Sequence, residues 1–281
     1  MKMKKKNFTK LGKRLLVILL FVLLALIVYP VVFMITSSFK TPNEISMEPI
    51  YQLPKSFYYK NYVDAVQYTR IWMLFRNTII VTLTSVFLSL VMCATTSFAL
   101  TKMQWRGQRV VSRFLTMGMF IPPFVLLLPQ FLMLQRIGWL NSRQGLILIY
   151  CGITSLPIFL MNGFYRFLPD EVLEASVIDG CGIYRMFWYV VIPMSLNGYV
   201  TVVMMIFFSI WNDLLISRTF TSSQQLRMLQ NGLAAFTDEH GGRNWGATFA
   251  AVTMATVPTI IVDLILNRKI IDGLTAGAVK G

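Results

Sequence analysis

EVLEASVIDGCGIYRMFWYVVIP, residues 171–193, is the stretch that decides the fold, and it lies between two long apolar segments. Acids are concentrated at its start, although the chain has only 12 Asp and Glu among 281 residues. The acidic residues here are Asp170, Glu171, Glu174 and Asp179. Such a cluster is either a solvated connector or a surface that pairs with basic groups of a partner.

The composition is that of a membrane protein. Hydrophobic residues make up 56% of the chain and charged residues 14%, with a mean hydropathy of +0.61, whereas soluble domains carry about 25% charged residues. The net charge of +14 comes from basic residues scattered among apolar runs, which argues against nucleic-acid binding. The dispersed cysteines and the single histidine, His240, lack the spacing of a disulfide framework or a metal site.

Six apolar intervals are long enough to cross a bilayer, which takes about 20 residues of helix. The predicted spans are 15–37, 77–100, 112–134, 144–165, 190–212 and 246–266. We expect them to form one transmembrane domain over residues 1–281. The first apolar run is too long for a signal peptide and lacks a cleavage site, so it is predicted to be retained. Most of the 26 Lys and Arg fall on one side if the N-terminus is cytoplasmic, which predicts cytoplasmic N- and C-termini.

This topology places the acidic stretch in a cytoplasmic loop, about 166–189, with a tail over 268–281. Pro169 and the adjacent acids are typical of a helix start, and Gly180 and Gly182 predict its end. Helical spacing places Val172, Ala175, Ser176 and Asp179 on one face. Because small residues allow another backbone to approach closely, the sequence favours a docking element over a linker.

The residues of this loop carry a family resemblance. Glu174-Ala175-Ser176, Gly180 and Val190-Val191-Ile192-Pro193 resemble the EAA motif of the permease subunits of ABC importers. The C-terminal run Gly273–Gly281 is similar to the tail of the maltose-type, carbohydrate-uptake permeases, in particular the shorter of the two permease subunits. The resemblance implies an all-α, type I importer permease fold with six transmembrane helices and a cytoplasmic coupling helix.

The resemblance also implies partners. These are a second permease subunit in a heterodimer, two ATP-binding subunits or a homodimeric ATPase, an extracellular solute-binding protein, a sugar substrate and membrane lipid. ATP and Mg would be bound by the ATPase subunits, because the chain contains no G-x-x-x-x-G-K-[ST] phosphate loop. We therefore expect a transport subunit without an enzyme site, in the cell (inner or cytoplasmic) membrane of a prokaryote.

Two groups of residues are implied as ATPase contacts. The coupling residues are Glu174, Ala175, Ser176, Asp179, Gly180 and Gly182, with Glu174 as the polar contact, Ala175 and Ser176 as the close contact and Gly180 as the turn. Asp179 either joins this contact or braces the loop internally. The tail contact consists of Gly277, Lys280 and Gly281, although chain ends of this composition are also compatible with fraying.

Polar side chains inside the spans are candidates for the substrate pathway, because such groups face a cavity or another helix. The predicted pathway residues are Asn77, Thr78, Thr82, Asn162, Ser209 and Asn212. Pro122, Pro123 and Pro129 predict an interruption of the third span, either as a gate or as a static kink.

Other functions remain as alternatives at this level. One is an ABC permease for another solute, such as glycerol phosphate or a polyol. Another is a secondary transporter, which needs charged or histidine residues at mid-membrane; the centres of the six predicted spans contain none.

Overall fold

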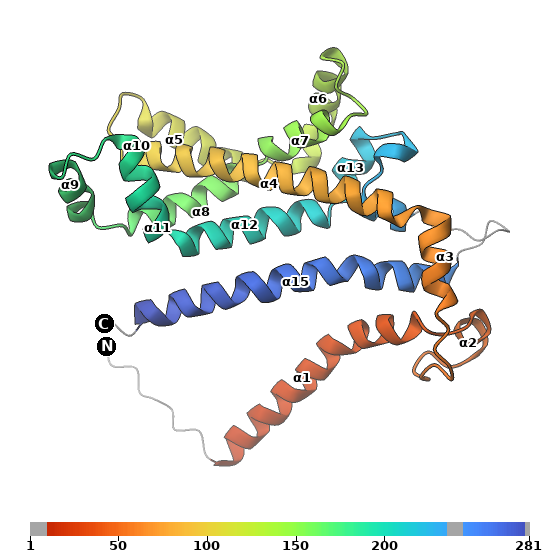
Figure 1. Cartoon of the computed structure of the whole chain (residues 1–281). Helices are drawn as coiled ribbons and strands as arrows, with labels where there is room; N and C mark the ends of the chain where they lie inside the picture. Colours follow the sequence, from red (N-terminus) through yellow and green to blue (C-terminus); the bar gives the residue numbers. More distant parts are fainter. Residues whose placement is uncertain (1–9, 235–243, 279–281) are drawn as a thin grey trace. The chain divides into compact units, whose positions relative to one another are not determined.

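A computed structural model describes residues 10–234 and 244–278, and these residues form helices joined by short connections (Figure 1). The contacts divide the chain into two compact units. Unit 1 comprises Met1–Arg70 and Phe236–Ala255, and unit 2 comprises Ile71–Ala235 and Thr256–Gly281. Three residues named above, His240, Lys280 and Gly281, lie outside the described residues.

Unit 1 begins with a long apolar helix, α1 (Lys10–Ser37), followed by an outer segment, residues 38–59. Within this segment Thr41 and Glu44 form a capping box at the start of α2 (Pro42–Met47), in which each side chain satisfies an N–H group that the helix leaves free. The amide of Asn61 in α3 (Lys60–Thr69) donates to the carbonyl oxygens of Ser38 and Lys40, at 2.9 and 2.8 Å. These bonds fix the outer segment against α3.

Unit 2 is built around α4 (Ile71–Thr101), which packs against α7 (Arg143–Gly152), α8 (Ser155–Arg166) and α12 (Leu196–Trp211) (Figure 1). The buried face of α4 is rich in small residues, including Ser85, Ser89, Ala94 and Ser97. Small side chains let helices approach closely where lipid supplies no hydrophobic driving force. Ser97 also donates its hydroxyl to the Ile158 carbonyl of α8 at 3.2 Å.

The other elements are shorter, apart from the last. They are α5 (Gln108–Met117), η1 (Gly118–Phe120), α6 (Pro123–Arg136), α9 (Asp170–Ile178), α10 (Ile183–Met186), η2, a π-helical turn (Phe187–Val191), α11 (Ile192–Met194), α13 (Leu215–Phe220), η3 (Gln224–Leu226), α14 (Leu229–Leu233) and α15 (Trp245–Ala278). Helix α15 begins in unit 1 and continues into unit 2.

Among the described residues, three helices are long and apolar enough to cross a membrane without a break: Gly12–Ser37, Ile71–Thr101 and Trp245–Leu266. Three further candidates are bent pairs, with angles of 106° between 108–120 and 123–136, 48° between 143–152 and 155–166, and 79° between 183–194 and 196–211. The described residues therefore offer six spans when each bent pair counts as one. The predicted spans 112–134, 144–165 and 190–212 fall on these pairs, and a break was predicted, from its prolines, only in the first of the three.

Proline accounts for the sharpest of these bends. Pro122 and Pro123 lie at the junction of η1 and α6, where neither can donate the hydrogen bond that would continue a helix. Pro129, in contrast, lies inside α6, and the helix continues through it to Arg136. The predicted interruption is therefore confined to 121–123.

Candidate functional site

The acidic stretch folds into the predicted helix. Helix α9 starts after Pro169, with Asp170 and Glu171 in its first turn. It ends at a left-handed glycine, Gly180, with φ of +80°. The Cys181 N–H donates to the Ser176 carbonyl and the Gly180 N–H to the Val177 carbonyl, both at 2.9 Å. This is the Schellman pattern, which requires positive φ at the residue after the cap.

Gly182 has a different role from the one predicted. Its φ and ψ of −67° and 162° are extended, and it precedes the first residue of α10. The expectation that it helps to end α9 is therefore wrong, because Gly180 alone supplies the left-handed residue. Gly182 instead begins the turn that returns the chain toward α12.

The outer face of α9 consists of four exposed residues, Glu171, Glu174, Ala175 and Ile178. They follow one another at helical spacing, and the Ile178 side chain is 85% exposed. Sequence reasoning missed Ile178, although its position seven residues after Glu171 is a usable signal. An exposed carboxylate, a small residue and a large apolar one together form a surface suited to a protein partner.

Ser176 does not belong to this face. It is buried, as is Leu173, and its hydroxyl donates to the Leu173 carbonyl at 2.7 Å. The predicted common face of Val172, Ala175, Ser176 and Asp179 is therefore split, because Ser176 turns toward its own chain. Asp179 is exposed at the end of the helix.

The start of α9 is tied to the end of α4 by Lys102. The Lys102 Nζ donates to the Leu168 carbonyl at 2.8 Å and to Asp170 Oδ1 at 2.6 Å. The Lys102 side chain is only 6% exposed, whereas that of Asp170 is 75% exposed. Because Asp170 stays in solvent, the ion pair adds little stability, but it sets the position of α9 relative to α4.

A second contact joins the same two regions. The Phe187 ring of η2 lies 5.2 Å from the Phe98 ring of α4, measured between centroids, and both side chains are buried. Figure 1 shows α9 and α10 together at one end of unit 2, with α6, α7 and α13 toward the other end. Both ends of the loop that carries α9 are thus anchored on α4.

Asn77 and Thr78 hold a segment in place rather than facing a pathway. Asn77 Nδ2 donates to the carbonyls of Gln225 and Arg227, at 2.8 and 3.0 Å, and Asn77 Oδ1 accepts from Arg143 Nη2 at 2.8 Å. Thr78 Oγ1 accepts the Leu229 N–H at 2.8 Å. Both residues are fully buried. Since their polar groups are occupied within the chain, we correct their predicted assignment to the substrate pathway.

Asp213, which follows the last turn of α12, organises the neighbouring turn. Its Oδ2 accepts from the Tyr150 hydroxyl of α7 at 2.8 Å and from the Ser217 N–H of α13 at 2.9 Å. This arrangement caps α13 and joins it to α7. Asn212, predicted to line the pathway, is exposed, and its amide donates to the Phe208 carbonyl at 3.1 Å.

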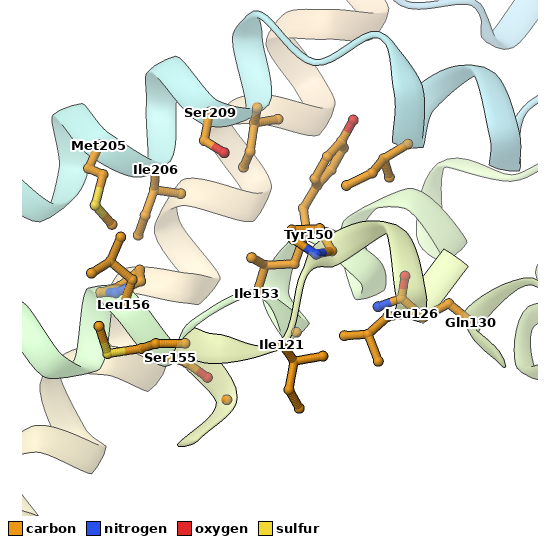
Figure 2. A pocket seen from close by; sticks show the side chains of 17 residues that line it. Ile121, Leu126, Gln130, Tyr150, Ile153, Ser155, Leu156, Met205, Ile206 and Ser209 are labelled. Carbon is orange, nitrogen blue, oxygen red and sulfur yellow. The ribbon is translucent and has the colours of Figure 1, made fainter. Parts of the chain in front are cut away.

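A cavity of about 350 Å³ lies at the breaks of the first two bent pairs, against the C-terminal half of α12 (Figure 2). It is lined from α6, from the α7–α8 junction and from α12, mainly by apolar side chains. Its polar lining residues are Gln130, Tyr150, Ser155 and Ser209. Ser209 is the one predicted pathway residue among them; Thr82 and Asn162 are buried elsewhere in unit 2 and do not line this cavity.

Of the three predicted tail contact residues, the structure describes one. Gly277 lies in the last turn of α15, and the other two predicted contact residues, Lys280 and Gly281, lie outside the described residues. The prediction of an ATPase contact by the tail stays a prediction.

Comparison with known proteins places the chain in a family. Residues 91–270 match the family described as binding-protein-dependent transport system inner membrane component. A diacetylchitobiose uptake system permease protein, NgcG of Streptomyces coelicolor, is 31% identical over 258 residues, covering 91% of this chain and 85% of the relative. The trehalose/maltose transport system permease protein MalG of Thermococcus litoralis is 27% identical, covering 96% and 98%.

A solved structure supports the fold. A chain from a bacterial ABC transporter involved in the import of the acidic polysaccharide alginate superposes with a TM-score of 0.84 at 20% identity, covering 95% of this chain and 99% of that one. The predicted all-α importer-permease fold is confirmed by this likeness and by the family match. The chain belongs to the family of binding-protein-dependent transport system inner membrane components, the multi-pass permease subunits of ABC importers.

Proposed function

We propose that this permease conducts a sugar or oligosaccharide across the membrane and receives the motion of a separate ATPase through α9. The observation that carries the proposal is the outer face of α9, exposed in solvent while the helix start is held to α4 by Lys102. Coupling needs a contact that moves with the ATPase and a rigid connection to a membrane helix. The outer face of α9 supplies the contact with the ATPase, and the bonds of Lys102 supply the rigid connection to α4.

The proposed partners follow from the family. They are a second permease subunit in a heterodimer, two ATP-binding subunits that hold ATP and Mg, and an extracellular solute-binding protein. Within α9 we assign Glu174, Ala175 and Ile178 to the ATPase contact, and Gly180 to the turn behind it. Ser176 is not assigned to this contact, because it is buried and its hydroxyl is hydrogen-bonded within its own helix.

A carbohydrate is the favoured cargo. NgcG and MalG are named for diacetylchitobiose and for trehalose and maltose, and the alginate importer handles another carbohydrate. The cavity at the helix breaks combines apolar walls with the amide of Gln130 and the hydroxyls of Tyr150, Ser155 and Ser209. Ligand sites commonly pair an apolar lining with a few polar groups, so we propose that Ser209 and Gln130 border the pathway.

The orientation that fits this role has both termini in the cytoplasm of a prokaryotic cell. This places α9 on the side of the ATPase and the outer segment 38–59 on the side of the binding protein. The excess of Lys and Arg in the segments on the α9 side supports it.

The proposal is tested with Glu174→Arg. The variant is expected to insert into the membrane normally but to lose ATPase subunits on purification and to abolish ATP-driven uptake of a labelled disaccharide in vesicles. Asp64→Arg makes the same charge change on α3, outside the loop, and is expected to behave as wild type. Undiminished uptake by Glu174→Arg would refute the coupling role.

The cargo is tested separately. The associated binding protein is purified and its bound solute identified, and the complex is assayed for uptake of labelled disaccharide, glycerol phosphate and polyol. A carbohydrate ligand with matching uptake is expected. Uptake of glycerol phosphate alone would overturn the sugar assignment and leave the coupling role intact.

A further inference from the structure

Unit 1 contains a second cavity, of about 320 Å³, at the end of α1. It is lined by α1, the outer segment and the first turns of α15, through Phe33, Ser37, Lys40, Glu44, Ile45, Ser46, Glu48, Ile50, Trp245 and Phe249. The Phe33 and Phe249 rings meet edge to face, with centroids 5.6 Å apart. Neither the fold family nor the coupling loop accounts for this cavity.

Two lining residues carry hydrogen-bond donors that are incompletely used. Ser37 is 1% exposed, and its buried hydroxyl has no hydrogen-bond partner within the described part of the chain. Lys40 is 4% exposed; among the described residues its Nζ donates to the Ile50 carbonyl at 3.2 Å and lies 5.9 Å from the Phe33 ring centroid. A buried ammonium and a buried hydroxyl without an acceptor both incur a desolvation cost. An anionic oxygen would satisfy both.

The acids that line the cavity are already engaged. Glu44 accepts from the Thr41 N–H and hydroxyl and from the Lys55 N–H, at 2.6, 2.9 and 2.9 Å. Glu48 forms an ion pair with Lys55. These bonds occupy the Glu44 and Glu48 oxygens, so among the described residues the Lys40 ammonium is the charged lining group that has no ion-pair partner and still has donors for an anionic oxygen.

The position of the cavity selects the kind of anion. The apolar span Gly12–Ser37 ends at this cavity, and the span Trp245–Leu266 begins there. Both ends therefore lie where the hydrocarbon core gives way to headgroups, a level that is rich in Trp and Lys. Below it, α1 presents exposed apolar residues such as Tyr29 and Val32, along which acyl chains can lie.

We propose that this cavity binds the phosphate of a membrane phospholipid, with Ser37 and Lys40 as its donors and Phe33 and Phe249 against the upper acyl chains. Lys binds phosphate as a point charge, and the Ser37 hydroxyl supplies a directed bond. A bound phospholipid would fasten α1 and the outer segment to α15 within unit 1. The proposal does not rest on the transport role or on which side is cytoplasmic.

The test uses the full-length protein, purified in mild detergent and examined by native mass spectrometry. The added probes are phosphatidylglycerol, diacylglycerol with the same acyl chains, and inorganic phosphate. Wild-type protein is expected to retain phosphatidylglycerol and to release diacylglycerol, and inorganic phosphate should not displace the lipid. Loss of a hydrogen bond to a charged group predicts about ten-fold weaker phosphatidylglycerol retention in Ser37→Ala, and a comparable or larger loss in Lys40→Gln.

Lys60→Gln is the matched control, because Lys60 is an exposed lysine at the start of α3 in the same unit and does not line the cavity, and it should retain lipid as wild type does. Ser37→Ala removes a buried hydroxyl without a partner, so its thermal unfolding temperature should not fall. Equal retention of diacylglycerol would show a merely apolar groove and overturn the proposal. Displacement of the lipid by inorganic phosphate would also contradict the proposal. So would a Ser37→Ala variant that retains phosphatidylglycerol as well as wild type does, or a loss of lipid seen only in Lys40→Gln and only because that variant is unfolded.

Discussion

Lys102 shows how one side chain can matter for coupling more than for stability. Its ammonium bridges the Leu168 carbonyl and Asp170, which are more than sixty residues away in the sequence. No local pattern announces such a pair, so the tie was not predictable. The acids, Gly180 and the spacing of the helix were predictable, because helix signals are local.

Substitution Lys102→Met tests this role. Met fills a similar volume, and Asp170 stays solvated, so the free energy of unfolding should change by less than about 1 kcal/mol. Loosening of α9 should nevertheless reduce sugar taken up per ATP hydrolysed by about five-fold, a coupling change of about 1 kcal/mol. Reconstituted complexes give both quantities. Lys55→Met, which removes an exposed ion pair, is the control. If the two variants take up the same amount of sugar per ATP hydrolysed, Lys102 has no role in coupling.

Substitution of Asn77, unlike that of Lys102, is expected to lower the stability of the fold. In Asn77→Ala two carbonyls and the Arg143 guanidinium lose their partners in a buried site. The expected cost is about 3 kcal/mol of unfolding free energy, seen as a lower unfolding temperature. Asn212→Ala, at an exposed position, should stay within about 0.5 kcal/mol of wild type. Equal stability of the two variants would restore Asn77 as a candidate pathway residue.

At the scale of elements, helix ends were easier to predict than helix bends. Hydropathy identifies six apolar intervals, but it gives no sign of the bends of 106°, 48° and 79° within three of the candidate spans; only the first of these bends was predicted, from its prolines. The apolar content of a segment does not indicate where its helix axis changes direction, because a bend depends on which backbone groups find hydrogen-bond partners in the folded protein. The cavity at two of these breaks was unpredictable for the same reason, and of the six predicted pathway residues only Ser209 lines it.

The end of α9 allows a test with a built-in control. An added Cβ would meet nothing within 4 Å at either Gly180 or Gly182, but only Gly180 has positive φ. Gly180→Ala should therefore cost about 1 kcal/mol and speed hydrogen exchange at the Cys181 amide. Gly182→Ala should leave that exchange rate as it is. Identical rates in the two variants would contradict the assigned cap.

The stability of the outer segment is expected to depend on pH through Glu44. Hydrogen bonds from the Thr41 and Lys55 backbone N–H groups lower the pKa of Glu44 from its ordinary 4.5. Its contribution to stability is therefore complete above pH 4.5 and lost as the pH falls through the lowered pKa of the folded state. Hydrogen exchange at the Lys55 amide should rise over that acidic range. In Glu44→Gln this acid-dependent rise should be absent; its persistence would assign the effect to another group.

For the whole molecule, the central claim is that the outer face of α9 meets the ATPase. Family membership gives the fold and the class of transporter, and the exposed face with its tie to α4 gives the claim a structural location. Ile178, 85% exposed, is the residue from which the contact is most directly probed.

The decisive measurement is photo-crosslinking from residue 178 in the assembled transporter. A photoreactive amino acid replaces Ile178 in one sample and Phe124, an exposed residue of α6, in the other. We expect position 178 to yield a crosslink to the ATP-binding subunit, identified by mass spectrometry, and position 124 to yield none. A crosslink from position 124 alone, or none from position 178 in an actively transporting complex, would contradict the account.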